Sequence, residues 1–312
     1  MNKFSEQTQV GLLLPSRETA MTGRHDAARL VELAVLAEQA GFDSVWTGDS
    51  PLARTRLDPI ALLSAVSAVT ERVRVGTATL VAALRHPALA AHSLSSVDQL
   101  SGGRLITTVG GGFPNAETER EFGSVAVPFT GRVGALDRAV QAWRAGWAAP
   151  RSTDPFVPLP AVRQGGPPVW LAGSDTPRVI ERVASRYDGW LPFLPDVSAY
   201  EVAWKAIRAR ASELGRTVTP GMFATVLLSS DPVRAQRELD EYALAYYRRP
   251  VAEMSTFQAY RAGTAEELVA WLGDYVRAGA RHLVLRVGSF EPTAQIERLA
   301  EEVLPALRRL SP

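Results

Sequence analysis

Side chains capable of chemistry are few at the ends of the predicted strands, and Asp49 is the most prominent of them. The segment SVWTGDSPL begins with apolar residues typical of a strand and ends at Asp49 and Ser50, before Pro51. A carboxylate at the end of a buried strand can act as a general acid or base, or can orient a bound molecule. We therefore take Asp49 and Ser50 as the candidate catalytic residues.

Several common chemistries lack the residues that they need. The chain has no cysteine, which excludes a thiol nucleophile, a disulfide framework and a thiolate metal site. The chain has two lysines. Lys3 precedes the first predicted strand and Lys205 lies within a predicted helix, so a Schiff base is not expected. The four histidines show no metal-ligand spacing, and we predict no metal site. A second carboxylate, Asp175, lies in a turn before a helix, where the role of an N-cap explains it at least as well as acid–base chemistry.

Small residues, in contrast, gather at three predicted strand ends. They form the runs Gly76–Thr79, Gly110–Gly112 and Ala172–Ser174. Small residues allow a large planar or phosphorylated ligand to approach the backbone closely. The third run also opens a helix at Pro177, and the backbone N–H groups of such a turn can bind an anion. We therefore expect an organic cofactor to carry the reaction.

The elements that position these residues alternate regularly along the chain. Predicted strands cover 10–14, 44–47, 73–79, 104–109, 169–171, 189–191, 222–228 and 282–287. Amphipathic stretches between them predict helices at 24–40, from 58 onward, and at 87–100, 130–147, 177–187, 199–214, 232–247, 264–278 and 293–310. Eight strand–helix units are what a (β/α)₈ barrel needs, and a doubly wound open sheet is the competing architecture.

We therefore predict an α/β chain with one (β/α)₈ (TIM) barrel domain over residues 1–312. Two stretches without periodicity, 148–168 and 248–263, are predicted as loop insertions after strands 4 and 7 that cover the pocket. Aromatic residues near the predicted strand ends and in the second loop could line that pocket. They are Trp190, Phe193, Phe257 and Tyr260.

The bulk composition is that of an ordinary globular protein. Hydrophobic residues make up 46% and charged residues 21% of the chain, with a net charge of +1. This balance gives no reason to expect nucleic acid as a partner, and no apolar run approaches the ~20 residues that would span a membrane. The apolar run at 10–14 is too short for the core of a signal peptide. We expect a cytoplasmic enzyme with a small-molecule substrate.

Taken together, several blocks of the sequence resemble the luciferase-like monooxygenase superfamily of flavin- and deazaflavin-dependent barrel oxidoreductases. They are AEQAGFDSVWTGDS, VRVGTATLVAALRHP, DQLSGGRLITTVGGGFPNAE, EFGSVAVPFTGR, VWLAGSDTPRVIERVASRYDGWLP and GARHLVLRVG. The resemblance implies an oxidoreductase or monooxygenase that uses FMN or coenzyme F420. Such an enzyme would act on a small organic substrate by hydride transfer or flavin-mediated oxygenation. Relatives often dimerise through barrel helices, so the resemblance also implies a homodimer.

The resemblance further assigns positions around the cofactor. Asp49 matches an acidic position near the ring, and the bond between Ala78 and Thr79 matches a non-proline cis peptide behind it. Arg132 matches a position that either reaches the phosphate or begins its helix. The other positions implied to contact the cofactor are Gly110, Gly111, Ala172, Gly173, Ser174, Asp175 and Trp190.

Two departures separate the chain from members that oxidise alcohols or sugar phosphates. Ser50 stands where those members often have histidine, and Phe113 stands where some have glutamate. Without these groups, a proton-abstracting dehydrogenase is disfavoured relative to a reductase or a monooxygenase. Two alternatives stay open, namely a flavin-binding protein without catalysis and a barrel hydrolase or lyase without flavin.

Overall fold

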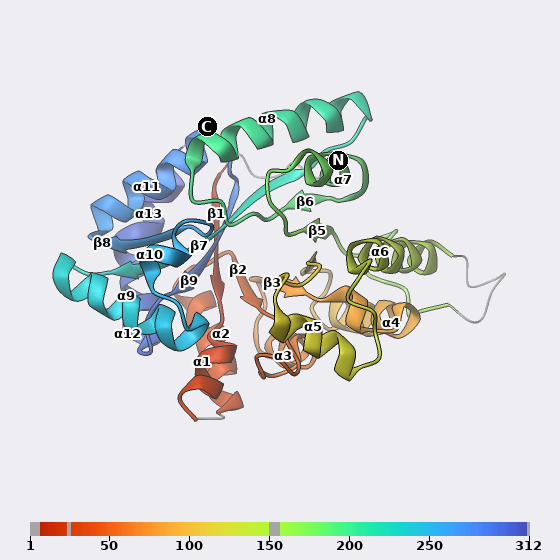
Figure 1. Ribbon diagram of the computed structural model, residues 1–312, viewed down its shortest axis with the longest axis horizontal. Coiled ribbons are helices and arrows are strands. Elements are labelled where there is room, and N and C mark those ends of the chain that lie inside the picture. The colour runs from red at the N-terminus through yellow and green to blue at the C-terminus, as the bar shows by residue number, and fades with distance from the viewer. Residues whose placement is uncertain (1–6, 24–25, 150–156, 311–312) are drawn as a thin grey trace.

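Eight parallel strands close into a barrel that helices surround in the computed structural model, which describes residues 7–23, 26–149 and 157–310 (Figure 1). Each strand pairs with the next one along the chain, and the last pairs with the first, which closes the ring. These strands are β1 (Gln9–Leu13), β2 (Ser44–Thr47), β3 (Arg74–Leu80), β4 (Leu105–Val109), β5 (Val169–Leu171), β6 (Gly189–Trp190), β7 (Thr219–Leu228) and β9 (His282–Val287). The predicted barrel is confirmed, and the doubly wound sheet is excluded.

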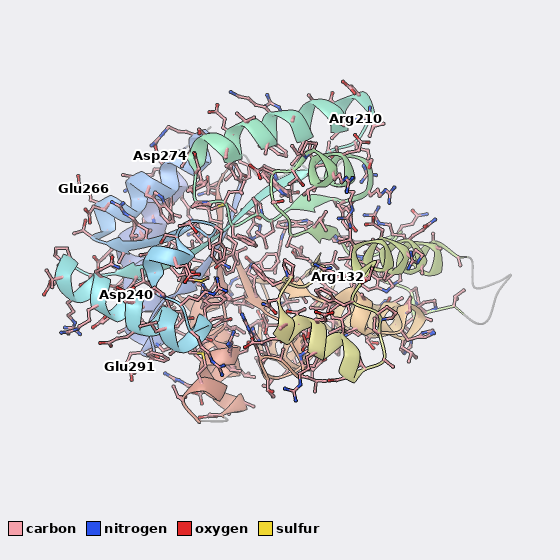
Figure 2. All side chains as sticks on the ribbon, viewed as in Figure 1. Arg132, Arg210, Asp240, Glu266, Asp274 and Glu291 are labelled. Atoms are coloured by element: carbon pink, nitrogen blue, oxygen red, sulfur yellow. The ribbon has the colours of Figure 1, made fainter. Side chains whose placement is uncertain are left out.

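Helices cover the outside of this barrel (Figure 1). Their bounds are α1 (Ser16–Met21), α2 (Ala27–Gln39), α3 (Pro59–Val69), η1 (Ala82–Leu84), α4 (Pro87–Leu100), α5 (Ala116–Ser124), α6 (Arg132–Ala148), α7 (Pro177–Arg186), α8 (Val197–Glu213), α9 (Pro232–Tyr247), α10 (Val251–Met254), α11 (Ala265–Arg277), α12 (Pro292–Arg298), η2 (Leu299–Val303) and α13 (Leu304–Arg309). Charged side chains such as Arg210 and Glu266 point outward from them (Figure 2). None of the helices in the described part of the chain combines the length and the apolarity that a membrane crossing requires.

Capping residues explain why several helices begin where the sequence predicted. Asp58 accepts hydrogen bonds from the backbone N–H groups of Ile60 and Ala61, and Pro59 occupies the first turn of α3. A capping box of Thr264 and Glu267 starts α11. The predicted helices 87–100 and 232–247 form with the predicted bounds, as α4 and α9.

The structure differs from the prediction in the second predicted loop, in two helices that were not predicted and in the closing helix. The second predicted loop, 248–263, contains α10 and a ninth strand, β8 (Tyr260–Gly263), which pairs with the end of β7. Helices α1 and α5 were not predicted, because the first is only 6 residues long and the second has a low overall hydrophobicity. The closing helix is interrupted by the π-helical turn η2. Of the first predicted loop, residues 150–156 lie outside the described residues, and 157–168 form neither helix nor strand.

Two tryptophans and a histidine pack together in the interior of the barrel, beside aliphatic side chains. The rings of Trp46 and Trp170 lie 5.7 Å apart, and His282 contacts each edge-on at 5.4 Å. A ring nitrogen of His282, Nε2, lies 2.7 Å from the hydroxyl of Ser44. The strands carry glycine where the indoles lie, because a Cβ atom at Gly76 would come within 2.3 Å of Trp46. The same holds at Gly11 against Trp46 and at Gly189 against Trp170.

The buried histidine makes the stability of the protein depend on pH. Burial, followed by the charge of Arg74, lowers the pKa of His282 to about 3, whereas an unfolded histidine titrates near 6.5. The stability contributed by the neutral ring is therefore complete above about pH 6.5 and is lost as the pH falls toward 3. We expect His282→Gln to reduce the pH slope of the unfolding free energy in this window by about 1.4 kcal/mol per pH unit.

Urea unfolding at several pH values measures this slope. His86→Gln is the matched control, because His86 is exposed and its side chain makes no capping hydrogen bond. A slope that is the same in the wild type and in His282→Gln would contradict this prediction, because it would show that His282 is protonated over the same pH range in the folded and unfolded protein.

Candidate functional site

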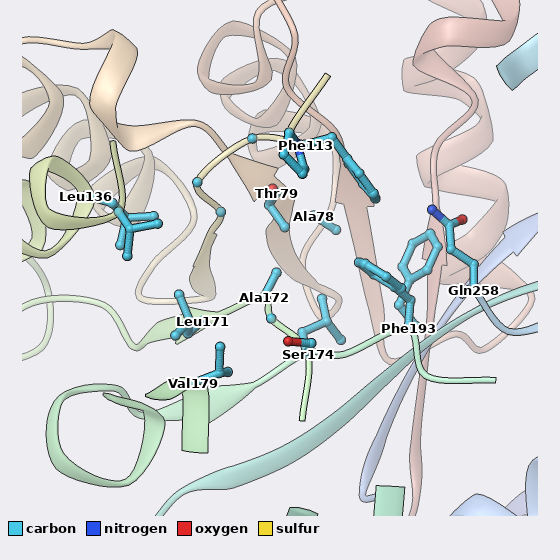
Figure 3. A pocket seen from close by; sticks show the side chains of 18 of the residues that line it. Ala78, Thr79, Phe113, Leu136, Leu171, Ala172, Ser174, Val179, Phe193 and Gln258 are labelled. Carbon is cyan, nitrogen blue, oxygen red and sulfur yellow. The ribbon is translucent and has the colours of Figure 1, made fainter. Parts of the chain in front are cut away.

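A cavity of about 420 Å³ opens at the carboxyl ends of the strands, where the barrel fold places its active sites (Figure 3). Strands β1, β3, β5, β7 and β9, the segments after β4 and β6, and helices α6, α7 and α9 all contribute to its wall. Seven of the sequence-predicted cofactor residues line it, namely Ala78, Thr79, Gly110, Gly111, Ala172, Gly173 and Ser174. The barrel therefore brings the three runs of small residues together around one space. Their contact with a cofactor stays a prediction.

The segment after β3 forms one wall of the cavity. The peptide bond between Ala78 and Thr79 is cis, which confirms what the resemblance implied. The pairing of β3 with β4 shifts between Thr77 and Leu80, at the same place. Gly110 packs against this segment so closely that a Cβ atom there would lie 2.6 Å from Oγ1 of Thr79. Glycine at this position therefore lets the segment after β4 approach the β3 wall without displacing the Thr79 side chain.

Asp49 is hydrogen-bonded to the segment after β3 and is not among the residues that line the cavity. Its carboxylate accepts hydrogen bonds from the backbone N–H of Val81 at 2.9 Å and from Nη1 of Arg85 at 2.5 Å. Only 1% of the Asp49 side chain is exposed. Burial raises the pKa of Asp49, and the hydrogen bond and charge of Arg85 oppose that rise. The contacts are those of a residue that positions the chain after β3, while a catalytic or ring-side role stays a prediction.

Ser50 belongs to a separate hydrogen-bond network that was not predicted. Its hydroxyl donates to Oε1 of Glu121 at 3.2 Å and accepts from the backbone N–H of Arg54 at 3.1 Å. The same Glu121 oxygen accepts from the N–H groups of Leu52 and Ala53. Glu121 is 3% exposed and lies on α5, so these hydrogen bonds connect the loop after β2 to that helix. Ser50 is not part of the cavity lining, and its predicted catalytic role is untested.

The turn between β5 and α7 forms the opposite wall. Gly173 packs against Val179, and a Cβ atom on Gly173 would lie 2.8 Å from Cγ1 of that valine. Trp190 is buried and stacks on Tyr200 at 5.1 Å, and its Nε1 donates to the carbonyl of Gly173 at 3.2 Å. Trp190 therefore supports the turn from behind and is not a lining residue.

The remaining sequence predictions near this turn have different outcomes. Asp175 is exposed and lies outside the lining, and the N-cap of α7 is Thr176, so the N-cap interpretation of Asp175 is wrong. Among the aromatic residues predicted for the pocket, Phe193 lines it and stacks on Phe113 at 5.8 Å. Trp190, Phe257 and Tyr260 do not line it.

A cluster of ionic contacts joins α6 to α7 beside the turn. Asp137 accepts hydrogen bonds from Arg182 at 2.6 Å and from the hydroxyl of Tyr187 at 2.7 Å. Burial works to raise the pKa of Asp137, but Arg182 and Tyr187 together hold it below its usual value. Arg132 begins α6, as one of its two predicted roles required, and its guanidinium lies 3.9 Å from the ring centroid of Phe129. Its buried Nε has no hydrogen-bond partner among the described residues.

The other end of the cavity is built from arginine and tyrosine. Arg286 on β9 is 2% exposed, and its guanidinium donates to the hydroxyls of Tyr247 at 2.8 Å and Tyr260 at 2.7 Å. Arg56, Tyr246, Tyr247 and Arg286 all line this end. The sequence analysis missed it, because its residues come from β9, from the end of α9 and from the loop after β2. The two arginines lie far from each other and from the adjacent pair Tyr246 and Tyr247 in the sequence, so the four residues form no local motif.

Removing the Asp49 carboxylate is expected to destabilise the fold. Asp49→Ala should lower the unfolding free energy by about 3 kcal/mol, because it leaves the partly buried Arg85 without its better partner and the Val81 N–H without an acceptor. Asp58→Asn is the matched control, since it removes the other, exposed ion pair of Arg85 but keeps a good N-cap. Chemical denaturation measures both variants, and equal small losses would contradict the anchoring role.

Comparisons with known proteins agree with this geometry. The family described as luciferase-like monooxygenase matches residues 8–282. An F420-dependent glucose-6-phosphate dehydrogenase of Beutenbergia cavernae is 28% identical, with 89% of this chain and 93% of that protein covered. The structure of the monooxygenase RslO1 from Streptomyces bottropensis superposes with a TM-score of 0.78 at 23% identity, over 95% of this chain and 99% of that one.

A further structure shares the fold at lower identity. The FMN complex of the oxygenating constituent of 3,6-diketocamphane monooxygenase from Pseudomonas putida superposes with a TM-score of 0.76 at 15% identity. The superposition covers 96% of this chain and 98% of the Pseudomonas putida chain. The family match spans most of the chain, and the predicted resemblance is confirmed. The chain belongs to the luciferase-like monooxygenase family and is an oxidoreductase of that class.

Proposed function

We propose that the protein is an oxidoreductase that binds FMN or coenzyme F420 in the cavity at the carboxyl ends of the strands and acts on a small organic substrate. The observation that carries this proposal is the wall of small residues around a cavity of about 420 Å³. Relatives named as F420-dependent dehydrogenases and flavin-dependent monooxygenases support the same class of cofactor. The cytoplasmic location and the homodimer stay predictions.

The lining fits such a cofactor at both its ring and its phosphate. Gly110 and Gly173 both line the cavity, and a Cβ atom would collide with Thr79 at the first position and with Val179 at the second. Glycine at both positions keeps side chains out of these two walls. Next to Gly173, the start of α7 presents backbone N–H groups that favour a phosphate, with Ser174 as an additional donor. Leu136, Leu171 and Val179 supply apolar contacts (Figure 3).

The bound cofactor would supply a hydride, or would activate oxygen when reduced. The protein would orient the ring against the β3 wall and hold the substrate over its open face. Phe113, Phe193 and Phe223 line the cavity and would exclude water from that face. Arginines and tyrosines close the far end, where a polar group of the substrate would lie.

A substitution that fills the cavity tests this location. A Cβ atom at Gly111 would contact only Val133, at 3.5 Å, so a side chain can be built there without a clash with the backbone. We expect Gly111→Leu to fold normally and to weaken the binding of FMN and F420 at least about tenfold, because the leucine would occupy the cofactor's space. Titration of the protein with each cofactor, followed by ring absorbance, measures the affinities.

Gly123→Leu is the control, because a Cβ atom at Gly123 meets nothing within 4 Å and the residue is outside the cavity lining. If the wild type binds neither cofactor, the proposed function fails. If Gly111→Leu binds as tightly as the wild type, the cofactor lies elsewhere.

A further inference from the structure

The cavity lacks the groups that commonly transfer protons in enzymes. Its lining, taken over the described residues, contains no aspartate, glutamate, histidine or lysine. The hydroxyl groups that line it belong to Thr79, Ser174, Tyr246 and Tyr247. A phenol ionises far more readily than an aliphatic hydroxyl, so the two tyrosines are the candidates for proton transfer.

Tyr246 and Tyr247 each face three arginines, but Arg17 and Arg286 lie nearer to Tyr246. Their guanidinium groups lie 5.9 and 5.1 Å from the centroid of the Tyr247 ring, and Arg286 donates to the Tyr247 hydroxyl at 2.8 Å. The guanidinium of Arg17 lies 4.2 Å from the centroid of the Tyr246 ring, and that of Arg286 lies 4.6 Å from it. Nη2 of Arg56 donates to the Tyr246 hydroxyl at 3.4 Å. Three arginines from three different elements therefore converge on one phenol that is only 5% exposed.

Few anionic groups balance these arginines. Among the described residues, Arg17, Arg56 and Arg286 form no ion pair with a carboxylate, while the neighbouring Arg54 pairs with Glu117. Glu18 on α1 is the nearby carboxylate, and it is hydrogen-bonded to the hydroxyl of Tyr242. Buried cations without a counterion are costly, and an ionised phenol among them would lower that cost.

The electrostatic balance favours ionisation of Tyr246. Burial raises its pKa, Arg56 lowers it, Glu18 raises it, and Arg286 and Arg17 lower it further. The net effect is a pKa below the usual value of tyrosine near 10. Two further tyrosines that face the cluster, Tyr242 on α9 and Tyr260 on β8, have pKa values that burial raises.

Contacts with the end of β2 and with its own loop fix the position of the Arg56 guanidinium beside Tyr246. A Cβ atom at Gly48 would lie 2.4 Å from Nη1 of Arg56 and 3.5 Å from the carbonyl oxygen of Ala78. Nε of Arg56 donates to the carbonyl of Arg54 at 3.3 Å. The guanidinium is thus held between the end of β2, the β3 wall and the Tyr246 hydroxyl.

We propose that Tyr246 is a catalytic residue that transfers a proton to or from the oxygen of an alcohol or ketone substrate, with Arg56 and Arg286 as its positioning residues. The proposal rests on the proposed function, because it needs a flavin or deazaflavin as the redox partner. Oxidation of an alcohol to a ketone releases a hydride, which that cofactor class accepts, and a proton, which the Tyr246 phenolate accepts at Oη. In ketone reduction the cofactor supplies the hydride and the Tyr246 hydroxyl supplies the proton.

The ionisation of Tyr246 can be tested without cofactor or substrate. Tyrosinate absorbs in the near ultraviolet at longer wavelength than tyrosine, so a pH titration of the folded protein counts the tyrosines that ionise early. We expect the wild type to show one tyrosine ionising below pH 10 that Tyr246→Phe lacks. Arg56→Gln should shift this ionisation to higher pH, since it removes the cation that lowers the pKa most.

Tyr275→Phe is the matched control, because Tyr275 is also buried, lies outside the cavity lining and has a pKa that burial raises. Its early ionisation should match that of the wild type. If the titrations of the wild type and Tyr246→Phe are the same below pH 10, the proposal is overturned. Cofactor binding does not enter this measurement, so its failure is distinguishable from failure of the proposed function.

Discussion

Two indole rings lie in the interior of the barrel, and the neighbouring strands can approach them only where they carry small residues. Trp46 and Trp170 face each other across the interior, and neighbouring strands carry glycine where the rings lie. The rings and His282 share this interior with aliphatic side chains, which dominate it in most such barrels. The carboxyl ends of the same strands carry small residues, and the space above the rings remains open as the cavity.

The cavity has two chemically different ends. Glycine, alanine and serine from β4 and β5 form one end, where backbone atoms are the exposed surface. Arginine and tyrosine from β9, α9 and the loop after β2 form the other end, where side-chain charge dominates. A planar cofactor needs close approach to the backbone, while a substrate oxygen needs a nearby donor or acceptor. The two ends match these two needs and lie in one cavity.

Much of the fold and part of the site could be predicted from the sequence, because their signals are local. Strands and helices follow from apolar periodicity and caps, and runs such as Gly110–Gly112 are visible without a structure. The partner of Asp49 was not predicted, because Arg85 is 36 residues away and the ion pair forms only when β2 and β3 are adjacent. Tyr246 was missed for the same reason, since its helix supplies no motif and its arginines come from α1, β9 and the loop after β2. The absence of histidine after Asp49 disfavours a proton-abstracting dehydrogenase, and Tyr246 in the buried cluster is the group that we propose for proton transfer.

The ninth strand has a consequence for how this enzyme can diversify. Strand β8 pairs with the end of β7, from Thr225 to Leu228, and the backbone of Ala259 forms hydrogen bonds with Phe193 and Thr225. The segment between α9 and β8, which brings Gln258 to the cavity, is therefore held at its end by main-chain hydrogen bonds that do not depend on side-chain identity. Mutations between Arg248 and Gln258 can change the shape of the substrate end while the barrel and the cofactor end stay intact. Under the proposed function, substitutions in this one short insertion would change which substrates the enzyme accepts.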